Sequence, residues 1–213
     1  MTDVTRATAW SLLCEFTGTQ PLRRHALSVE ASMRALARRA GVAPDEVEAW
    51  GIVGMIHDFD YERYPTHEDH VWRGMEILRG RGWPERLVRA VGAHANYSGI
   101  APEAPIERAI VAADELSGFV GACALVRPSR SVRDLPPESV VKKMKDRAFA
   151  RSVDRGEIRR GAEVVGMPLL DLVALVIAAQ VPIADRLGIG GTVAPDLPDD
   201  PVPGEPDAGA PGP

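Results

Sequence analysis

The chain is poor in the residues on which several common protein classes depend. Its only two cysteines, Cys14 and Cys123, form no Cys-x-x-Cys pair, and each lies in an apolar helical run. We therefore expect reduced core thiols rather than a thiolate metal site, with a disulfide as the lesser alternative. Aromatic residues make up 5% of the sequence. The core should accordingly be built mainly from aliphatic side chains.

The sequence also lacks an excess of positive charge and a long apolar segment free of charge. It has 25 Lys and Arg against 30 Asp and Glu, a formal net charge of -5. This balance offers no electrostatic footprint for bulk nucleic-acid binding. No apolar stretch is long enough to span a membrane, and residues 1–6 show no signal-peptide pattern. We expect a cytoplasmic protein that binds neither membranes nor bulk nucleic acid.

Apolar residues recur at helical spacing through most of the 213 residues, without strand-like alternation or internal repeats. Helices are predicted over residues 22–40, 44–57, 67–79, 84–94, 106–126 and 169–187, with short helices near 142–145 and 154–165. The third begins near His67, where Thr66 to Asp69 resembles a capping box. The length suits one sizeable domain. We predict an all-α, single-domain helical bundle over residues 1–187.

The composition changes sharply at Gly188. From there to Pro213 the chain is rich in Pro, Gly and Asp, and acidic without basic residues after Val193. Such a segment has too little apolar surface to form a core of its own. Residues 188–213 are therefore predicted to be a disordered acidic tail.

Histidine is scarce, with five in the chain, yet four of them share predicted helix faces with apolar residues. Taken singly, each such histidine is more often a hydrogen-bonded core residue, and an aspartate on such a face is more often a cap or an ion-pair partner. Together, several inward imidazoles and two inward carboxylates are hard to satisfy by ordinary hydrogen bonds. The predicted metal ligands are His25, His57, Asp58, His70, His94 and Asp114. Imidazole and carboxylate ligands suit zinc, manganese, iron, cobalt or nickel.

Two further polar residues lie near these positions in the sequence. His67, three residues before His70, is an alternative ligand, but as the first residue of a capped helix it is expected to face solvent. Asp60 is expected to be a loop residue or a hydrogen-bond partner of a ligand. Gly74, one turn after His70, would permit a close approach of another helix.

The order of these residues resembles a known signature. His25, then His57-Asp58, then Asp114 is similar to the H…HD…D pattern of the HD superfamily of metal-dependent phosphohydrolases, and His70 and His94 match the two additional histidines of its dinuclear branch. The resemblance covers about residues 22–125. The segment up to about residue 187 is similar to the second half of small bacterial HD-domain proteins.

The resemblance implies a dinuclear centre with two divalent metal ions. One ion would be bound by His25, His57, Asp58 and Asp114, and Asp58 would bridge to a second ion bound by His70 and His94. A metal-bound hydroxide would then hydrolyse a phosphoester of a small molecule, with a nucleotide as one candidate. Asp58, His70 and His94 would be catalytic as well as metal ligands.

Two other functions fit the same ligands. Some proteins with this six-ligand pattern hold a di-iron centre and act as oxygenases, and the ligands alone do not separate the two chemistries. A non-catalytic ligand-binding module is the third class, but such proteins usually lack a ligand, and none is missing here. The GYP motif of cyclic-dinucleotide hydrolases is absent after His94, which argues against that activity.

The substrate phosphate needs a positive partner. Lys142 and Lys143 belong to a basic cluster, and Arg127 lies in the basic loop before it, so these three residues are candidates for binding the phosphate. A solvated helix face is the alternative interpretation. Arg24 directly precedes His25, but helical geometry is expected to turn it to a different face.

Overall fold

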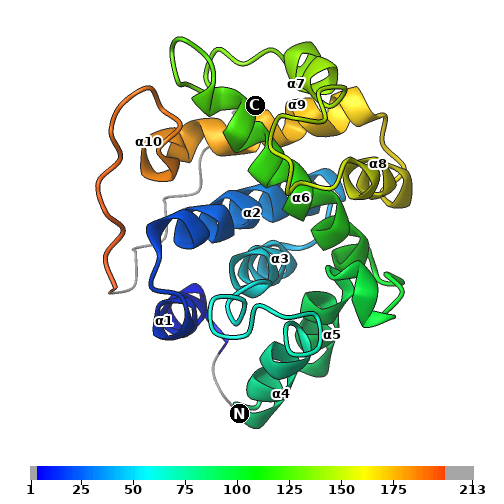
Figure 1. Ribbon diagram of the computed structural model, residues 1–213. Helices are drawn as coiled ribbons and strands as arrows, with labels where there is room; N and C mark the ends of the chain where they lie inside the picture. The colour runs from blue at the N-terminus through cyan, green and yellow to red at the C-terminus, as the bar shows by residue number, and fades with distance from the viewer. Residues whose placement is uncertain (1–3, 200–213) are drawn as a thin grey trace.

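A computed structural model describes residues 4–199, and every regular element among them is a helix (Figure 1). The elements are α1 (Arg6–Phe16), α2 (Gln20–Arg39), α3 (Pro44–Ile56), α4 (Trp72–Gly80), α5 (Glu85–Ala93), the 3-10 turn η1 (Asn96–Ser98), α6 (Pro105–Leu125), α7 (Pro137–Lys143), α8 (Arg155–Val164), α9 (Leu169–Gln180), the 3-10 turn η2 (Val181–Ile183) and α10 (Ala184–Leu187). The predicted all-α class is confirmed.

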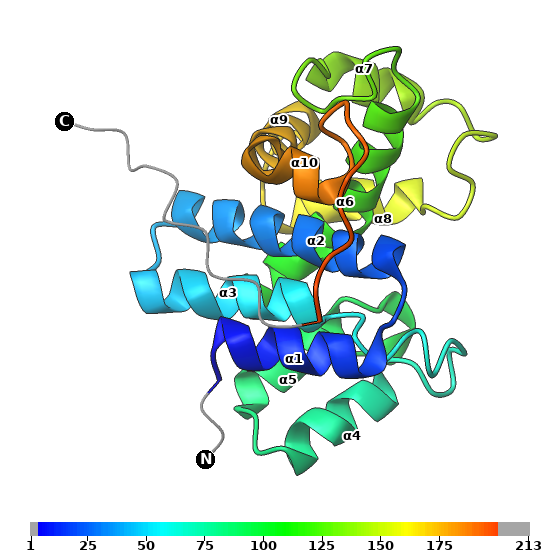
Figure 2. The same cartoon turned by 90° about the vertical axis from the view of Figure 1, so that its left-hand side faces the viewer.

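Helix α2 lies at the centre of the bundle. It packs on α3 on one side and on α6 and α9 on the other, and α1 lies beyond it against α3 (Figures 1 and 2). Its inward face buries Val29, Met33 and Ala37 completely. The core is mainly aliphatic, as expected, although Trp10 and Phe119 are among its largest fully buried side chains.

Helix α6 has a strongly fixed start, which matters because it carries Asp114. Pro105 occupies its first turn, where a missing N–H costs nothing. The carboxylate of Glu107 accepts the backbone N–H groups of Glu103 (2.7 Å) and Ala104 (2.9 Å). The same carboxylate pairs with Arg89 at 2.8 Å. These contacts satisfy donors that a helix start otherwise leaves unpaired.

Two predicted helices have different boundaries in the structure. Helix α4 begins at Trp72, not near His67, because residues 66–71 form turns that end with a buried Val71 at φ 60. This backbone conformation is unfavourable for a β-branched residue and cannot continue a helix. The predicted last helix is interrupted after Gln180, since Pro182 lacks the N–H that a helix interior requires.

The predicted disordered tail is corrected for residues 188–199. Ile189 and Leu197 are buried, with 4% and 5% of their surface exposed. The side-chain amide of Gln20 makes two hydrogen bonds to the backbone of Leu197. Its Nε2 donates to the carbonyl oxygen at 3.2 Å, and its Oε1 accepts the N–H at 2.8 Å. Two well-placed apolar side chains thus hold a segment whose overall composition is polar. The remainder of the predicted tail, residues 200–213, lies outside the described residues.

Two other expectations can be compared with residues 4–199. Cys14 and Cys123 are both free thiols in this part of the chain, so the disulfide alternative is not realised there. No single helix in the same range is long and apolar enough to cross a membrane. Only residues 155–164 taken together with 169–187 reach that length and composition, and this pair is bent by 97°.

The close packing of α8 on α6 gives a test of the fold. A Cβ added at Gly161 would lie 2.7 Å from Cα of Ala112 and 2.9 Å from the carbonyl oxygen of Val111, so backbone would have to move. We expect Gly161→Ala to lower the free energy of unfolding by about 1–3 kcal/mol in urea denaturation. The control is Gly80→Ala, where an added Cβ meets nothing within 4 Å. Equal stability of the two variants would contradict this packing.

Candidate metal centre

The fold brings the six predicted ligands together from five parts of the chain. His25 lies within α2 and Asp114 within α6, whereas His57 and His94 cap the C-terminal ends of α3 and α5. Asp58 follows His57, and His70 precedes α4. Their ligand atoms form two groups, in each of which all atoms lie within 4.8 Å of one another: His25, His57, Asp58 and Asp114, and then Asp58, His70 and His94.

The two groups meet at the carboxylate of Asp58. One of its oxygens, Oδ1, lies 3.1 Å from Nε2 of His70 and 3.1 Å from Nε2 of His94. The other, Oδ2, lies 3.4 Å from Nε2 of His57. Each oxygen of Asp58 therefore faces a different group, which is the arrangement that a bridging carboxylate requires.

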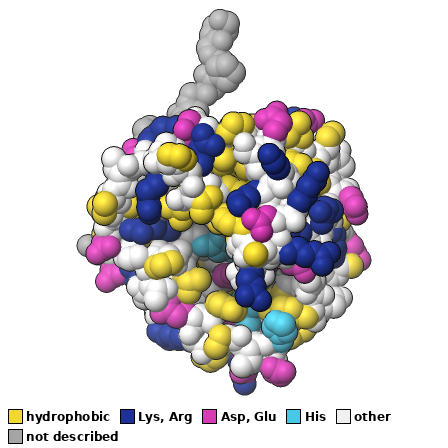
Figure 3. Space-filling view, turned by 45° about the horizontal axis from the view of Figure 1, so that its top comes forward, with side chains coloured by type: hydrophobic (Ala, Val, Ile, Leu, Met, Phe, Trp, Pro, Cys, Tyr) yellow, Lys and Arg dark blue, Asp and Glu magenta, His cyan; other side chains and the backbone are white. Residues whose placement is uncertain are grey.

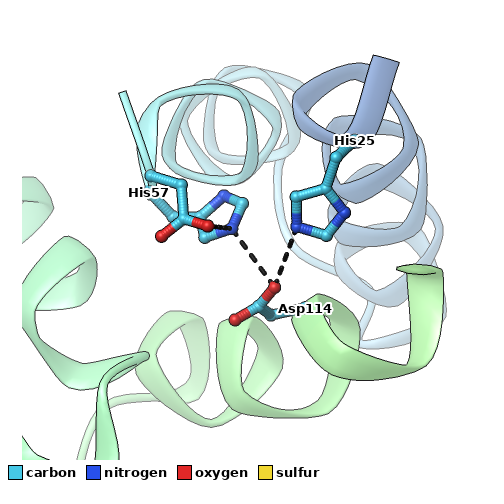
Figure 4. Close-up of side chains that lie close together, drawn as sticks. His25, His57 and Asp114 are labelled. Carbon is cyan, nitrogen blue, oxygen red and sulfur yellow. Dashed lines mark hydrogen bonds and ion pairs between the residues drawn. The ribbon is translucent and has the colours of Figure 1, made fainter. Parts of the chain in front are cut away.

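Asp114 completes the first group (Figure 4). Its Oδ1 lies 3.1 Å from Nε2 of His25 and 3.2 Å from Nε2 of His57. Both imidazoles present the same nitrogen, Nε2, to the same oxygen. The three side chains come from α2, from the end of α3 and from α6, so the packing of these helices sets their separation.

Two of the histidines are oriented by the helices that they end. Nδ1 of His57 donates to the carbonyl of Gly54 at 2.8 Å, and Nδ1 of His94 donates to the carbonyl of Val91 at 2.6 Å. Since a carbonyl oxygen can only accept, the proton of each neutral ring must lie on Nδ1. The lone pair on Nε2 is then directed into the centre, as in most histidine metal ligands.

Asp60 orients the third histidine. It is fully buried, and its Oδ1 accepts from Nδ1 of His70 at 3.1 Å while its Oδ2 accepts the N–H of Gly74 at 3.0 Å. A Cβ at residue 74 would lie 2.9 Å from Cγ of Asp60, so glycine is needed there. Asp60 is therefore a hydrogen-bond partner of the candidate ligand His70, which is one of the two roles expected for it. The close approach expected at Gly74 is made by this carboxylate rather than by a helix.

The donor set fits a divalent transition-metal ion. Nε2 of His57 is buried and makes no hydrogen bond to any part of the chain that the structure describes, a costly state unless a cation binds it. Its neighbours are imidazole nitrogens and carboxylate oxygens, which suit zinc, manganese, iron, cobalt or nickel.

The side chains of the candidate ligands differ in how far they are exposed to solvent. The side chains of His57, His70 and His94 are 0%, 4% and 6% exposed, whereas those of Asp58 and His25 are 26% and 23% exposed. A small molecule can therefore approach from the side where Asp58 and His25 lie.

The charges of the cluster shift its pKa values in opposite directions. Burial disfavours the charged form of Asp58, but His57 and the hydrogen bonds from His70 outweigh it and hold the pKa of the carboxyl well below its usual range. Burial likewise opposes charge on His57, yet Asp58 and Asp114 raise its pKa well above the ordinary value. For His70, burial is outweighed by bonds to Asp58 and Asp60, and the pKa rises to about 9.

Aromatic neighbours of the centre are not anticipated by the sequence pattern. The exposed His67 stacks on Tyr97, with ring centroids 4.2 Å apart, so it faces outward, as expected, and does not replace His70. Tyr61 packs edge-on against His70 at 5.1 Å. Burial and the nearby Asp58 raise the pKa of the Tyr97 hydroxyl. Burial and Asp114 similarly raise the pKa of Glu115 to about 7.

The predicted phosphate-binding residues are not brought to the centre. Arg127 pairs with Asp134 at 3.1 Å, and Lys143 pairs with Asp146 at 2.9 Å. Lys142 lies beside Lys143 in the last turn of α7, which packs on α9 and α6. Arg24 is an arginine that does lie near the centre, because it lines the same cavity as His25. The expectation that helical geometry turns Arg24 to a different face from His25 is therefore corrected.

No protein-family model matches the chain, and no curated protein or solved structure matches it either. The helical fold and the cluster of six His and Asp residues are compatible with an HD-type site. Any more specific assignment depends on the geometry of these side chains.

Metal binding should release protons. Below about pH 9 the raised pKa of His70 keeps its ring protonated in the metal-free protein, so a metal ion must displace that proton. We expect about one proton or more to be released per protein at pH 7.5, and the affinity to fall by about tenfold per pH unit and per displaced proton as the pH is lowered. Calorimetric titration with Zn²⁺ in buffers of different ionisation enthalpy measures this. A binding enthalpy independent of the buffer would contradict it.

Replacing Asp60 tests the orientation of His70. Asn at this position has one acceptor oxygen for two buried N–H donors, those of His70 and Gly74, so one donor loses its partner. We expect Asp60→Asn to weaken metal binding by about 10–100-fold, measured by competition with a chelator. The matched control is Asp171→Asn, at an exposed site on α9. If both variants bound metal equally well, Asp60 would have no orienting role.

Proposed function

We propose that the protein is a metal-dependent phosphohydrolase that cleaves a phosphoester of a small molecule. The observation that carries this proposal is the carboxylate of Asp58, whose two oxygens face two separate groups of histidine nitrogens. A pair of adjacent divalent ions is a common device for hydrolysing phosphoesters. The resemblance of the six residues to the HD signature points to the same chemistry.

Each residue has a role in this proposal. His25, His57 and Asp114 would hold one ion, His70 and His94 would hold another, and Asp58 would contribute to both groups. Ions held in this way would polarise a phosphoryl oxygen and lower the pKa of a water molecule towards neutrality. The protein's contribution is to hold the imidazoles in place before the ions bind, through the backbone and Asp60 contacts. The exposed edges of Asp58 and His25 are where the phosphate reaches the centre.

Metal content and a substrate panel test the proposal. We expect protein purified without chelator to contain a divalent transition metal, and metal-loaded protein to release phosphate from a panel of alkyl, sugar and nucleoside phosphates. Metal-loaded protein that hydrolyses no ester would contradict the proposal. Oxygen consumption by the iron-loaded protein, together with a mixed-valent paramagnetic signal, would favour the oxygenase alternative instead.

Asp58→Ala is the decisive single substitution. Because both groups lose an oxygen ligand, we expect metal content and activity to disappear together, with a loss larger than the roughly 10–100-fold that removing an orienting partner costs. Elemental analysis and phosphate release measure the two quantities on the same sample. Asp171→Ala is the control, since this residue is exposed and lies outside both groups. A variant at position 58 that kept full metal content and turnover would refute the assignment.

A further inference from the structure

A cavity of about 680 Å³ lies beside the metal centre. It is lined by residues of α2 and α6, by Arg130 and by residues between Leu187 and Ala194, and the part of this segment from Gly188 onward was expected to be disordered. Figure 3 shows a hollow in one face of the molecule, with histidine and acidic side chains in its depth and with apolar and basic side chains around it. The volume is in the range of cavities that hold a small organic ligand.

His25 connects the cavity to the centre. Its Nε2 faces Asp114, while the opposite edge of the ring lies beside Gly118, where a Cβ would be 3.6 Å from Nδ1. Both residues line the cavity. The other three ligand histidines each donate from Nδ1 to a carbonyl or carboxylate, but Nδ1 of His25 has no such partner within residues 4–199. A metal-bound histidine usually donates this hydrogen, so a ligand or water in the cavity is its natural acceptor.

The charge of the cavity is opposite in sign to that of the whole protein. Arg24 and Arg130 line it, and no Asp or Glu does. Within the described residues neither arginine has a carboxylate partner; Arg24 donates only to the carbonyl of Pro195 at 3.3 Å, and its buried Nε is unpaired. Many other arginines do pair with carboxylates, as Arg133 does with Asp185 at 2.7 Å. In a chain of net charge -5, two such guanidinium groups favour an anionic ligand.

Most of the remaining lining residues are aliphatic or glycine, and the hydroxyl groups of Ser28, Ser117 and Thr192 are the uncharged polar exceptions. Leu125, Leu187, Ile189 and Val193 contribute to the aliphatic part, and Leu125 remains 41% exposed and Val193 97% exposed. No Phe, Tyr or Trp is among the lining residues. A nucleobase is normally bound by stacking on an aromatic ring, which this cavity does not offer. An aliphatic group does not need an aromatic ring for its binding free energy, and its transfer from water to an apolar surface is favourable.

We propose that this cavity binds the hydrocarbon part of an aliphatic phosphate monoester, with the phosphate at the His25 end and Arg24 and Arg130 supplying positive charge. The inference rests on the proposed phosphohydrolase function and names its substrate class. In the reaction, the oxygen of water bonds to phosphorus and the P–O bond to the alcohol breaks. The alcohol leaves with one proton from that water, and inorganic phosphate is the other product. No redox partner is required.

Binding of non-hydrolysable alkylphosphonates tests the cavity without relying on turnover. We expect metal-loaded protein to bind hexylphosphonate at least about tenfold more tightly than methylphosphonate in calorimetric titration, because the added methylenes leave water. Gly121 lies on α6 and lines the cavity, so Gly121→Leu should abolish this difference by filling the space. Gly121→Ala is the matched control, since a Cβ at residue 121 meets nothing within 4 Å. Equal affinity for the two phosphonates, or an unchanged difference in Gly121→Leu, would overturn the proposal.

A second pair of variants guards against a folding defect. Leu125 and Leu170 are both 41% exposed, but only Leu125 lines the cavity. Leu125→Glu places a negative charge in the cavity and should weaken hexylphosphonate binding by about tenfold or more, while Leu170→Glu should leave it unchanged. Thermal unfolding followed by circular dichroism compares the stability of the two variants. Equal binding by two equally stable variants would also overturn the proposal.

Turnover separates a failure of this inference from a failure of the proposed function. We expect a higher kcat/KM for hexyl phosphate than for methyl phosphate or for nucleoside monophosphates. Preferred hydrolysis of nucleoside monophosphates, without an effect of alkyl chain length on binding, would overturn the substrate class and leave the phosphohydrolase function intact. The opposite result is also possible: binding depends on alkyl chain length and loses this dependence in Gly121→Leu, but no ester is hydrolysed with any metal. In that case the cavity assignment would stand and the proposed phosphohydrolase function would be refuted.

Discussion

The structure depends on how two carboxylates, Asp58 and Asp114, are accommodated among buried histidines. A carboxylate away from water is costly unless opposite charge or hydrogen bonds compensate it. Here His57 lies between the two, 3.4 Å from an oxygen of Asp58 and 3.2 Å from an oxygen of Asp114, and it is itself fully buried. Without a metal ion, the negative charge of the two carboxylates must be balanced by protonated imidazoles. For this reason Asp58 and Asp114 raise the pKa of His57, although burial alone would lower it. A divalent ion satisfies the same groups without added protons, so the arrangement favours metal binding.

Helix ends supply most of the orientation that this centre needs. The last carbonyls of a helix have no N–H partner within the helix. At the ends of α3 and α5, such a carbonyl three residues earlier accepts Nδ1–H of His57 and of His94. One hydrogen bond thus satisfies an otherwise unpaired carbonyl at the helix end and directs Nε2 into the centre. His70 lies just before the start of α4 rather than at a helix C-terminus, and its ring is held by Asp60 instead. The dependence on Gly74 follows, because a side chain there would displace that carboxylate.

The fold class and the set of six candidate ligands could be predicted because both are local signals: apolar periodicity, and polar residues in register with it. What the sequence did not reveal depends on contacts between distant residues. Leu197 is bound by Gln20 across 177 positions, so composition alone misjudged residues 188–199. The start of α4 was misplaced because Val71 is held at positive φ by tertiary packing, against its intrinsic preference. Helical geometry predicted that Arg24 faces away from His25. It could not show that the C-terminal segment folds back and forms one cavity with both residues.

The four histidines that are candidate ligands are not equivalent, and this asymmetry connects the candidate centre to its surroundings. Three are locked by the protein through Nδ1, while His25 presents that edge of its ring to a cavity with basic and aliphatic walls. One wall is residues 188–194, far outside the region that resembles the HD signature. The ligands can therefore be held constant while a distant segment changes the shape and charge of the cavity beside them. In the proposed function, the chemistry would reside in the six candidate ligands, and selection of the organic group would reside in the C-terminal segment and in the glycine-containing face of α6.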